Sequence, residues 1–571
     1  MDMVLFCRNF IKGGSKMKIT LKAMSLILAI FISLMVLGAC AASQEQTGEP
    51  TSAPTEKPAQ ETQGNQTQEP SSDEVTYPLA DGESFTCWWP NDLVMSGVVD
   101  YNETPFFQYM EKKTGVHLVF YNPSPQGAAE QYNLMLVSGD LPDFFRQLYQ
   151  YHTRGLDDAI ENGYFIDLME YQKWTPNLFG RLRASDEAFK QAITDSGYLV
   201  GFPMIMDEPQ QWVNGMMIRE DWLRKYGLEK PATIDDVERV LTIFRDNEPT
   251  AANGPLYMNN MAFTGLESSY NLPSNFGLAA VDGFIYRDGA VRASVLEPTY
   301  KEYIEKLTDW YAKGLITPDF VNNVGYISIF DREGRQNGKY GITYDCFVYM
   351  DDENEFVGGD FEFGPMAMPA RKAGETVHVL GTDKMVWPGA LGVTTACHNI
   401  ELACRYWDYL YSDEGSLYAN YGEEGVTLEF DAEGKPHLSD FAKNHPEMNL
   451  NQVENYYTLL DGPFYRYCAR EYEAISENEL RCGVEWMKGD GLYNLPSNLT
   501  FTTDEGTTKA NIMSDIRTFV AENQVKFITG QKPLSEFDDF IEQVKRMGIL
   551  EVVEMYERAL ERYNNRLNII K

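Results

Sequence analysis

Residues 104–140 read TPFFQYMEKKTGVHLVFYNPSPQGAAEQYNLMLVSGD, and their pattern decides the fold. Thr104 and Pro105 fit the N-cap and the first position of a helix that Gly115 would end. The apolar face of this helix would consist of Phe106, Phe107 and Met110. The run Val116–Tyr121 that follows predicts a strand. A helix and a strand therefore succeed each other directly.

The alternation continues after that strand. Residues 128–137 have helical periodicity and end at Ser138–Gly139, which places Asp140 in the following turn. Strands and helices in alternation are typical of an α/β fold with a largely parallel sheet. The C-terminal fifth differs, because apolar residues at helical spacing predict mostly helix there. They are Phe537, Phe540, Ile541, Val544 and Met547, with a further helical segment over 550–564.

Length and composition bound the architecture and the partners. At 571 residues, the chain exceeds what one hydrophobic core usually organises, so two lobes are expected. Hydrophobic residues make up 43% of the chain, which provides ample core material. The formal net charge of −37 at pH 7 would repel nucleic-acid phosphates and anionic lipid headgroups. Composition therefore argues against nucleic acid as a partner and against electrostatic adsorption to membranes.

The N-terminus carries the pattern of a secretory signal, with an apolar run over 23–39. The basic residues before this run are Lys16, Lys18 and Lys22. The run ends at Leu37-Gly38-Ala39-Cys40, which resembles a bacterial lipobox, where the cysteine is acylated and becomes the mature N-terminus. We therefore expect a signal peptide over 1–39 and attachment to the extracellular face of the cell membrane through a palmitate-type lipid on Cys40 alone. An uncleaved membrane anchor is the alternative.

Residues 40–76 predict a disordered tether between the membrane and the body of the protein. From Ser43 to Glu74 the sequence contains no aromatic residue and no Val, Leu, Ile or Met. Such a stretch cannot bury enough apolar surface to offset the entropy lost on ordering. The signal peptide has two possible start residues, Met1 and Met17, and a signal that begins at Met17 is better proportioned.

No catalytic or metal-binding motif accompanies this pattern. The six histidines form no HExxH, no G-x-S-x-G occurs, and the cysteines form no CxxC pair. We therefore expect no metal, no cofactor and no enzymatic activity. With 85 acidic residues a carboxylate pair for glycoside hydrolysis is always available, so an anchored carbohydrate-degrading enzyme is the alternative.

The cysteines beyond the N-terminal segment are expected to be buried free thiols, which pack as small apolar residues. They are Cys87, Cys346, Cys397, Cys404, Cys468 and Cys482. A disulfide, for example between Cys397 and Cys404, is left open.

Several segments, in order, resemble the extracellular solute-binding protein family 1. The likeness is strongest to its large lipoprotein branch, which serves oligosaccharide ABC importers and includes the alginate-oligosaccharide binding proteins. The order and spacing hold from about residue 84 to the C-terminus. The segments are TPFF (104–107), EKKTGV (111–116), EQYNLMLVSGDLPD (130–143), IREDWL (218–223), YGL (226–228), DYLYSDEG (408–415) and YGEEGVT (421–427).

The resemblance implies a periplasmic-binding-protein-like fold of the second type, with two α/β lobes and the ligand cleft between them. The first crossing between lobes is expected near 202–217 and the return near 387–393. The expected parts are 77–215 for the first part of lobe 1, 216–388 for lobe 2, 389–430 for the return to lobe 1, and 431–571 for a mostly helical region packing on the lobes.

It also implies a function: a monomer that closes around a sugar or oligosaccharide and delivers it to the membrane permease of an ABC importer. A surface adhesin or sensor module with the same fold is a further alternative. Related proteins can carry a calcium loop after the helix that follows the crossing. The matching stretch 246–254 is short here and has apolar residues where ligands would alternate, so no calcium is expected.

A sugar ring has apolar faces edged by hydroxyls, so a binding cleft needs aromatic platforms beside planar polar groups. Trp88 and Trp89 close the first strand of the body, and because side chains alternate along a strand, at most one is expected to face the cleft. Trp387 lies at the predicted return crossing and is the strongest candidate platform. Tyr465 and Tyr467 match a ligand-facing loop in relatives, with core packing as the alternative.

Four polar candidates complete the expected ligand-binding site. Arg219 lies at the predicted crossing, where its guanidinium would bind hydroxyls or a carboxylate; an ion pair with one of the next two residues, both acidic, is the alternative. Asp140 lies in the family's Ser-Gly-Asp turn, where capping that turn is the alternative. Tyr344 and Asp345 occupy a position that carries cleft residues in relatives. Three other tryptophans are expected in the core: Trp222, Trp310 and Trp407.

Overall fold

In the computed structural model, the chain from residue 77 onward builds two lobes, each with its own sheet and apolar core. The predicted signal peptide, Cys40 and nearly all of the predicted tether lie outside the described residues. In the described part of the chain, no helix is long and apolar enough to cross a membrane. The described residues are 75–90, 100–209, 214–257, 272–278, 283–322, 331–378, 384–448, 450–459, 461–473 and 476–570.

A six-stranded sheet forms the centre of one lobe, called lobe 1 here, with strand order β13-β4-β10-β3-β1-β2. Five strands run in the same direction and β10 runs against them. The predicted largely parallel sheet is therefore confirmed for this lobe. The strands are β1 (Glu83–Trp88), β2 (Val116–Tyr121), β3 (Phe144–Arg146), β4 (Phe202–Met206), β10 (Val386–Val393) and β13 (Tyr465–Arg466).

Helices cover both faces of this sheet. Because successive residues of a strand point to opposite faces, Cys87 and Trp89 enter the larger apolar core while Trp88 enters a smaller one on the other face. The larger core involves α3 (Pro105–Thr114), α7 (Pro176–Arg183), α8 (Asp186–Ala192), α15 (Ile400–Asp408) and α16 (Asp413–Tyr421). The smaller involves α4 (Pro125–Ser138), α5 (Leu148–Tyr151) and α6 (Leu156–Glu161). The sheet is thus buried on both sides.

Helix α3 begins and ends where the sequence predicts. Its N-cap Thr104 accepts a hydrogen bond from the amide of Phe107, and Pro105 occupies the first position. Gly115 ends the helix with φ 70°, and a Cβ there would lie 1.9 Å from the carbonyl oxygen of Ala80. Only glycine fits that approach. Strand β2 follows with its predicted bounds, and α4 starts slightly earlier than predicted.

The second lobe, lobe 2, contains a three-stranded sheet of order β8-β5-β9 whose strands are antiparallel. The predicted largely parallel character does not extend to it, because the segments after β5 return the chain to the end of β5 from which it left, as antiparallel pairing requires. The strands are β5 (Asn214–Arg219), β8 (Ile342–Cys346) and β9 (Phe363–Pro365). The predicted core tryptophans are all buried: Trp222 and Trp310 in lobe 2 and Trp407 in lobe 1.

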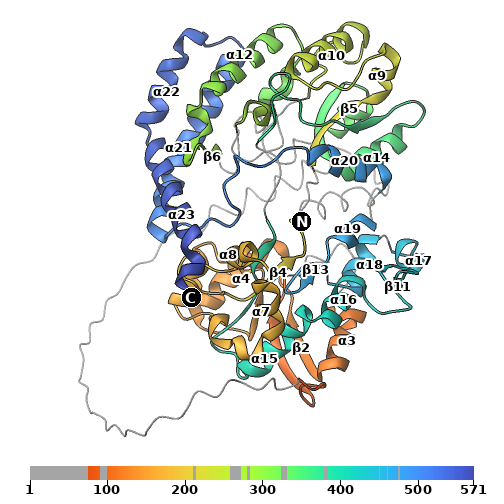
Figure 1. Cartoon of the computed structure of the whole chain (residues 1–571), viewed down its shortest axis with the longest axis vertical. Coiled ribbons are helices and arrows are strands. Elements are labelled where there is room, and N and C mark those ends of the chain that lie inside the picture. Colours follow the sequence, from red (N-terminus) through yellow and green to blue (C-terminus); the bar gives the residue numbers. More distant parts are fainter. Residues whose placement is uncertain are drawn as a thin grey trace, which may run out of the picture. The chain divides into compact units, whose positions relative to one another are not determined.

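Helices surround the second sheet, as Figure 1 shows for its upper lobe. They are α9 (Glu220–Tyr226), α10 (Ile234–Asn247), α12 (Pro298–Ala312), α13 (Arg332–Gln336), α14 (Phe347–Val357), α20 (Glu477–Trp486), α21 (Thr503–Ile528), α22 (Phe537–Arg546) and α23 (Ile549–Ile569). The last three confirm the predicted helical C-terminus. Smaller elements are β6 (Phe284–Arg287), β7 (Ala290–Ala293), β11 (Leu428–Phe430), β12 (Pro436–Leu438), α17 (Asp440–Lys443), α18 (Leu450–Tyr457) and α19 (Ala469–Glu473).

The sheets fix where the chain passes between lobes. β4 ends at Met206 and β5 begins at Asn214, so the first crossing lies within the predicted 202–217. The predicted return at 387–393 is instead part of a lobe 1 strand, because β10 pairs with both β3 and β4. The return therefore comes before Val386. The expected boundaries after residues 215 and 388 accordingly fall inside β5 and β10.

Helix α23 contributes to both lobes. Its first half packs in the lobe 2 core through Ile549, Val552 and Tyr556. Its last turns reach lobe 1, where Tyr563 donates a hydrogen bond to Glu187 of α8. Leu567 and Ile570 pack against the larger core of lobe 1. One continuous helix thus links the two apolar cores.

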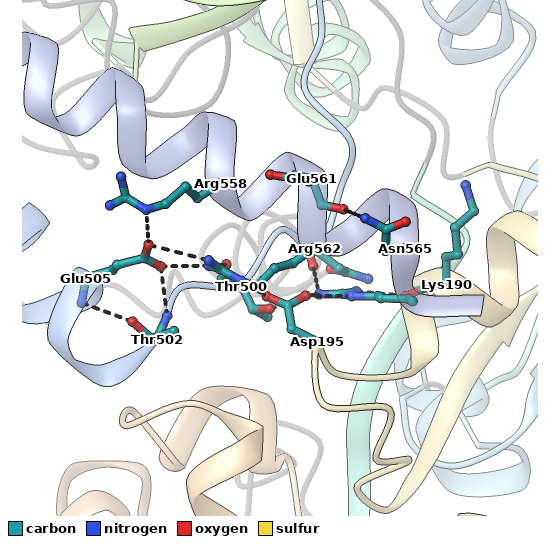
Figure 2. Close-up of polar contacts among 11 residues, drawn as sticks. Lys190, Asp195, Thr500, Thr502, Glu505, Arg558, Glu561, Arg562 and Asn565 are labelled. Atoms are coloured by element: carbon teal, nitrogen blue, oxygen red, sulfur yellow. Dashed lines mark hydrogen bonds and ion pairs between the residues drawn. The ribbon is translucent and has the colours of Figure 1, made fainter. Parts of the chain in front are cut away.

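A buried arginine fastens the end of α23 to lobe 1, and Figure 2 labels its surroundings, among them Asp195, Lys190 and Thr500. Arg566 is 1% exposed and donates to the Asp195 carboxylate at 2.8 Å. It also donates to the carbonyl of Lys190 at 2.7 Å and to Thr500 Oγ1 at 2.8 Å. One turn earlier, Arg562 bridges Asp195 to a carboxylate at the start of α21, Glu505.

At the opposite end of the strands, Asp143 fixes the start of β3. Its carboxylate accepts hydrogen bonds from the amide and hydroxyl of Thr86, at 2.8 and 2.7 Å, and lies 3.0 Å from Nδ1 of His398. The other ring nitrogen of His398 lies 3.0 Å from Glu83. Partial burial lowers the pKa of His398, but hydrogen bonds to Glu83 and Asp143 outweigh it and raise the pKa above 6.5.

Replacing Arg566 should weaken the attachment of α23. The change Arg566→Met leaves the largely buried Asp195 carboxylate with one arginine fewer and removes the bonds to the Lys190 carbonyl and the Thr500 hydroxyl, so a loss of about 3–5 kcal/mol in the free energy of unfolding is expected by urea titration. The matched control is Arg558→Met on the same helix, whose guanidinium is 49% exposed and should matter little. Equal effects of the two substitutions would contradict the role given to Arg566.

The carboxylates of Glu83 and Asp143 beside His398 should make the free energy of unfolding depend on pH. Because the folded-state pKa is raised, the contribution of His398 is complete below pH 6.5 and is lost as pH rises through the folded pKa. The stability advantage of wild type over His398→Gln should therefore shrink as pH increases from about 6 to about 8.5. Urea titrations of both proteins across that range measure it, and a constant difference would refute the assignment.

Candidate functional site

The carboxyl ends of the five parallel strands lie at one edge of the lobe 1 sheet, together with the start of β10. Ligands of open α/β sheets bind at this edge, beyond the last residues of the strands. The same edge is where β4 leads toward lobe 2 and where β10 re-enters lobe 1. A ligand site is therefore expected at this carboxyl edge.

Five residues at this edge, termed the edge cluster, combine buried polar groups with an aromatic ring: Arg146, Gln147, Tyr149, Trp387 and Asp461. The Asp461 carboxylate accepts hydrogen bonds through Oδ2 from all three polar neighbours. Arg146 donates at 3.3 Å, the Gln147 amide at 3.0 Å and the Tyr149 hydroxyl at 3.4 Å. The side chains of Arg146 and Asp461 are 7% and 9% exposed. A buried ion pair thus lies at the end of β3.

The backbone is unusual where β3 ends. Gln147 has φ 60° and ψ 46°, a left-handed conformation that costs a non-glycine residue about 1–3 kcal/mol. Its amide nitrogen donates to the carbonyl of Ala390 at 2.7 Å, which holds the turn against β10. The turn lets Gln147 share the carboxylate of Asp461 with its neighbour Arg146. Backbone strain of this kind is concentrated at functional sites, so the conformation of Gln147 favours a functional role for this turn.

Trp387 is the predicted site residue that the structure brings into the cluster. Its ring is half-buried and lies 5.4 Å from the ring of Tyr149. The ammonium of Lys384 lies 3.2 Å from the Trp387 ring centroid, a cation–π contact. The aromatic surface therefore adjoins the polar groups held around Asp461.

Trp88 and Trp89 are both packed, at 0% and 1% exposure. The sequence allowed one of them to face a cleft, but helices on both faces of the sheet bury both. Trp88 Nε1 donates to Gln131 at 2.9 Å in the smaller core. Trp89 contacts the edge cluster through Arg146, whose guanidinium lies 4.5 Å from the centroid of the Trp89 ring.

Asp140 lies apart from the edge cluster. It is exposed in the turn after α4, and its amide donates to Ser138 Oγ at 3.3 Å. Helix α4 joins two parallel strands and so runs against them, which puts its C-terminus at the edge opposite the strand ends. The geometry matches the turn-capping alternative.

Arg219 lies at the far end of β5 from the crossing, about 17 Å along the strand from Asn214. Its guanidinium donates to both carboxylate oxygens of Asp221, at 2.7 and 2.6 Å. It also lies 4.2 Å from the rings of both Trp222 and Phe361. The ion-pair alternative is therefore what the structure contains, and Arg219 is 5% exposed.

Tyr344 and Asp345 lie nearer the crossing. They belong to β8, where they pair with Met216 and Gly215 of β5, next to the residue at which the chain enters lobe 2. Tyr344 is half-buried against the lobe 2 core. The side chain of Asp345 lies outside the described residues.

Tyr465 and Tyr467 lie on or just after β13, also at the carboxyl edge. The guanidinium of Arg181 lies 4.1 Å from the ring of Tyr465, which is half-buried. The Tyr467 hydroxyl lies 3.0 Å from Ser416 Oγ on α16. Both rings therefore contact lobe 1 neighbours.

Sequence reasoning missed most of the edge cluster. Arg146 and Gln147 follow the apolar pair of β3, and polar residues at a strand end are a signal that could have found them. Asp461 carried no such signal, because it is more than 300 residues from Arg146 and in an irregular segment.

Metal-ligating groups and cysteine thiols were both considered in the sequence. They contain no group of three or more His, Cys, Asp or Glu side chains that could hold a metal ion. In the segment compared with a calcium loop, Glu248 accepts hydrogen bonds from Lys225 and Tyr226. Burial raises the pKa of Cys397 to about 12. The described cysteines are buried and free, as predicted: Cys87, Cys397, Cys404, Cys468 and Cys482.

Comparison with known proteins agrees with this architecture, although no protein-family model matches the chain. The fructooligosaccharide ABC transporter substrate-binding protein FusA of Streptococcus pneumoniae is 25% identical over 527 residues, covering 86% of this chain and 93% of that protein. Lipoprotein LipO of Bacillus subtilis is 26% identical over 234 residues, 38% of this chain and 42% of that protein. The structure of the alginate-binding protein AlgQ2 superposes with a TM-score of 0.63 at 20% identity, covering 86% of this chain and 100% of that chain.

The likenesses to FusA and AlgQ2 extend over most of the body and are consistent with a family 1 extracellular solute-binding protein. The fold is the two-lobed periplasmic-binding-protein-like fold, as the sequence predicted.

Proposed function

We propose that this protein is the extracellular substrate-binding component of an ABC importer and that it captures an oligosaccharide for delivery to the permease. The observation that carries the proposal is the likeness to a fructooligosaccharide-binding component over 86% of this chain and 93% of that protein. The edge cluster supports it independently, because planar polar groups beside an aromatic ring suit the alternating hydroxyls and apolar faces of a sugar.

Capture would follow from closure of the two lobes around the ligand. A ligand that contacts both lobes binds the closed arrangement more tightly and so shifts the population toward it. The edge cluster supplies the lobe 1 contacts in this scheme, and the end of β8 supplies those of lobe 2. Helix α23, which packs in both cores, would serve as the pivot about which the lobes rotate.

Among the residues expected from the sequence, we assign ligand contact to Trp387, with Tyr344 and Asp345 on the lobe 2 side. Trp387 is supported by its half-buried ring beside Tyr149. Both residues of β8 are supported by their register opposite the start of β5. The partners of Arg219 and the position of Asp140 support structural roles for those two side chains.

We further propose that the mature protein is a monomer anchored by a lipid on Cys40 and that it performs no chemistry on its ligand. The lipobox-like sequence that ends at Cys40 supports the anchor. A flexible tether over residues 40–76 would hold the body near the permease. The absence of catalytic motifs from the sequence favours binding over turnover.

Binding should be visible as stabilisation of residues 77–571 by a saccharide that is recovered unchanged. At a ligand concentration 100 times the dissociation constant, the gain is about 2.7 kcal/mol, which raises the melting temperature by a degree or more. The measurement is a thermal-shift screen of neutral and acidic oligosaccharides, followed by chromatography of each mixture. Breakdown of the sugar would make the protein an enzyme, and no shift with any saccharide would refute the proposal.

Loss of the platform ring should weaken binding without unfolding the protein. Trp387→Ala removes a half-buried aromatic surface at the proposed site, and a drop in affinity of about tenfold or more is expected by calorimetric titration. Trp174→Ala is the matched control, since that ring is also half-buried but stacks on Tyr171 outside the edge cluster. Similar affinity losses in both variants would assign the effect to packing instead of ligand contact.

A further inference from the structure

The start of β10 lacks a neighbouring strand on one of its edges. β4 pairs with one edge of β10, whereas β3 pairs with the other edge only over Leu391–Val393. At Val386 two side-chain amides occupy the place of that strand. The Val386 amide donates to Gln191 Oε1 at 3.2 Å, and its carbonyl accepts from Asn498 Nδ2 at 2.9 Å. The point at which the chain re-enters lobe 1 is thus held by Gln191 and Asn498.

These two amides belong to different lobes. Gln191 lies in α8 of lobe 1, whereas Asn498 lies between α20 and α21, two helices of lobe 2. The residues that flank Asn498 stay with lobe 2, because Leu495, Leu499 and Phe501 pack in or against its core. Asn498 also donates to the backbone carbonyl of Gln191 at 3.2 Å. One side chain of a lobe 2 segment therefore binds two carbonyls of lobe 1.

The backbone of Asn498 is fixed as well as its side chain. It has φ 64°, in the left-handed region that asparagine tolerates better than most other residues. Its carbonyl accepts a hydrogen bond from the buried Arg566 at 3.1 Å. Two residues further, the carbonyl of Thr500 accepts from Arg562 at 3.2 Å, within the network of Figure 2. Asn498 therefore lies where the lobe 2 segment, β10 and the end of α23 meet.

We propose that Asn498 is a positioning residue for ligand capture, which restrains rotation of the lobes by clamping a lobe 2 segment to the start of β10. A hinge is a short stretch of residues that absorbs the backbone rotation of domain closure. The bonds of Asn498 to two carbonyls tie such a stretch to lobe 1. The consequence for binding rests on the proposed function, whereas the restraint itself does not.

The restraint reduces the freedom that a ligand must remove when the lobes close around it. Without the Asn498 amide, the lobes sample a wider range of separations, and the closed arrangement forms a smaller fraction of the unliganded population. The apparent affinity of a ligand that binds the closed arrangement falls by the same fraction. Asn498 thereby acts on affinity without touching the ligand.

The decisive variant is Asn498→Gly, because glycine adopts the same φ and only the side-chain amide is lost. It is made in residues 77–571 with spin labels at one exposed position of each lobe, Val137→Cys and Asp235→Cys. The described native cysteines are buried and so shielded from the label. Pulsed electron paramagnetic resonance then gives the distribution of distances between the labels without ligand. We expect this distribution to be about one and a half times as wide as in wild type, or wider.

Asn354→Ala is the matched control, since Asn354 also clamps backbone with its side-chain amide but does so within lobe 2. Its Nδ2 donates to the carbonyl of Phe363 at 2.9 Å, and its Oδ1 accepts from the Phe363 amide at 2.7 Å. Both variants should lower the melting temperature, while only Asn498→Gly widens the distance distribution. Asn498→Asp keeps the shape but cannot donate to the two carbonyls, so it repeats the test if the glycine variant folds poorly.

Binding is measured by calorimetric titration with kestose and maltotriose as probes. Affinity should fall about three- to tenfold in Asn498→Gly and stay within about twofold of wild type in Asn354→Ala. An unchanged distance distribution in Asn498→Gly, or equal broadening in both variants, would overturn the inference, as would an unchanged or raised affinity. If no saccharide of the wider screen binds wild type, the proposed function fails, and the distance distributions alone decide the role of Asn498.

Discussion

A strand that is buried on both faces can offer side chains to a ligand only at its ends. The six-stranded sheet of lobe 1 is under this constraint, because α3, α7, α8 and α15 pack on one face and α4 and α5 on the other. The alternation of Cys87, Trp88 and Trp89 between the two cores follows directly. Side chains that can contact a ligand therefore lie at the edge where the parallel strands end. The chain also passes between the lobes at this edge.

Buried charge in this molecule is concentrated where segments distant in sequence meet. Arg566 joins α23 to the turn at Asp195, and Arg146 joins β3 to Asp461. Such pairs add little net stability relative to apolar packing, since desolvation offsets much of the attraction. What they provide is geometry, because a charge without its partner is costly to bury. The first pair fixes a helix that spans both cores, and the second holds Asp461 at the edge of the sheet.

These two arrangements suit a protein that must move and still recognise its ligand. Closure requires a passage between lobes that bends and a contact that does not slide. The long α23 with its buried arginine supplies a fixed contact, while the edge cluster lies on the lobe 1 side of the crossings. A contact that is ordered before binding loses little freedom when the ligand arrives, so more of its interaction appears as affinity.

The sequence by itself determined the local elements and the class of fold. Thr104, Pro105 and Gly115 specify the limits of α3 through capping and backbone conformation, which are local properties. The alternation of strands and helices specified an α/β body, and apolar spacing specified the helical C-terminus. Residue patterns of this kind act within a few turns of chain and can be recognised from the sequence.

Only the tertiary structure decided which side chains meet. From the sequence, an ion pair and a ligand contact were equal alternatives for Arg219. In the folded protein its guanidinium pairs with Asp221 and lies against the rings of Trp222 and Phe361. Trp387 stood out in sequence, but its neighbour Tyr149 comes from a segment more than 200 residues away. The physical reason is that long-range pairing depends on how sheets and helices pack, which no local pattern encodes.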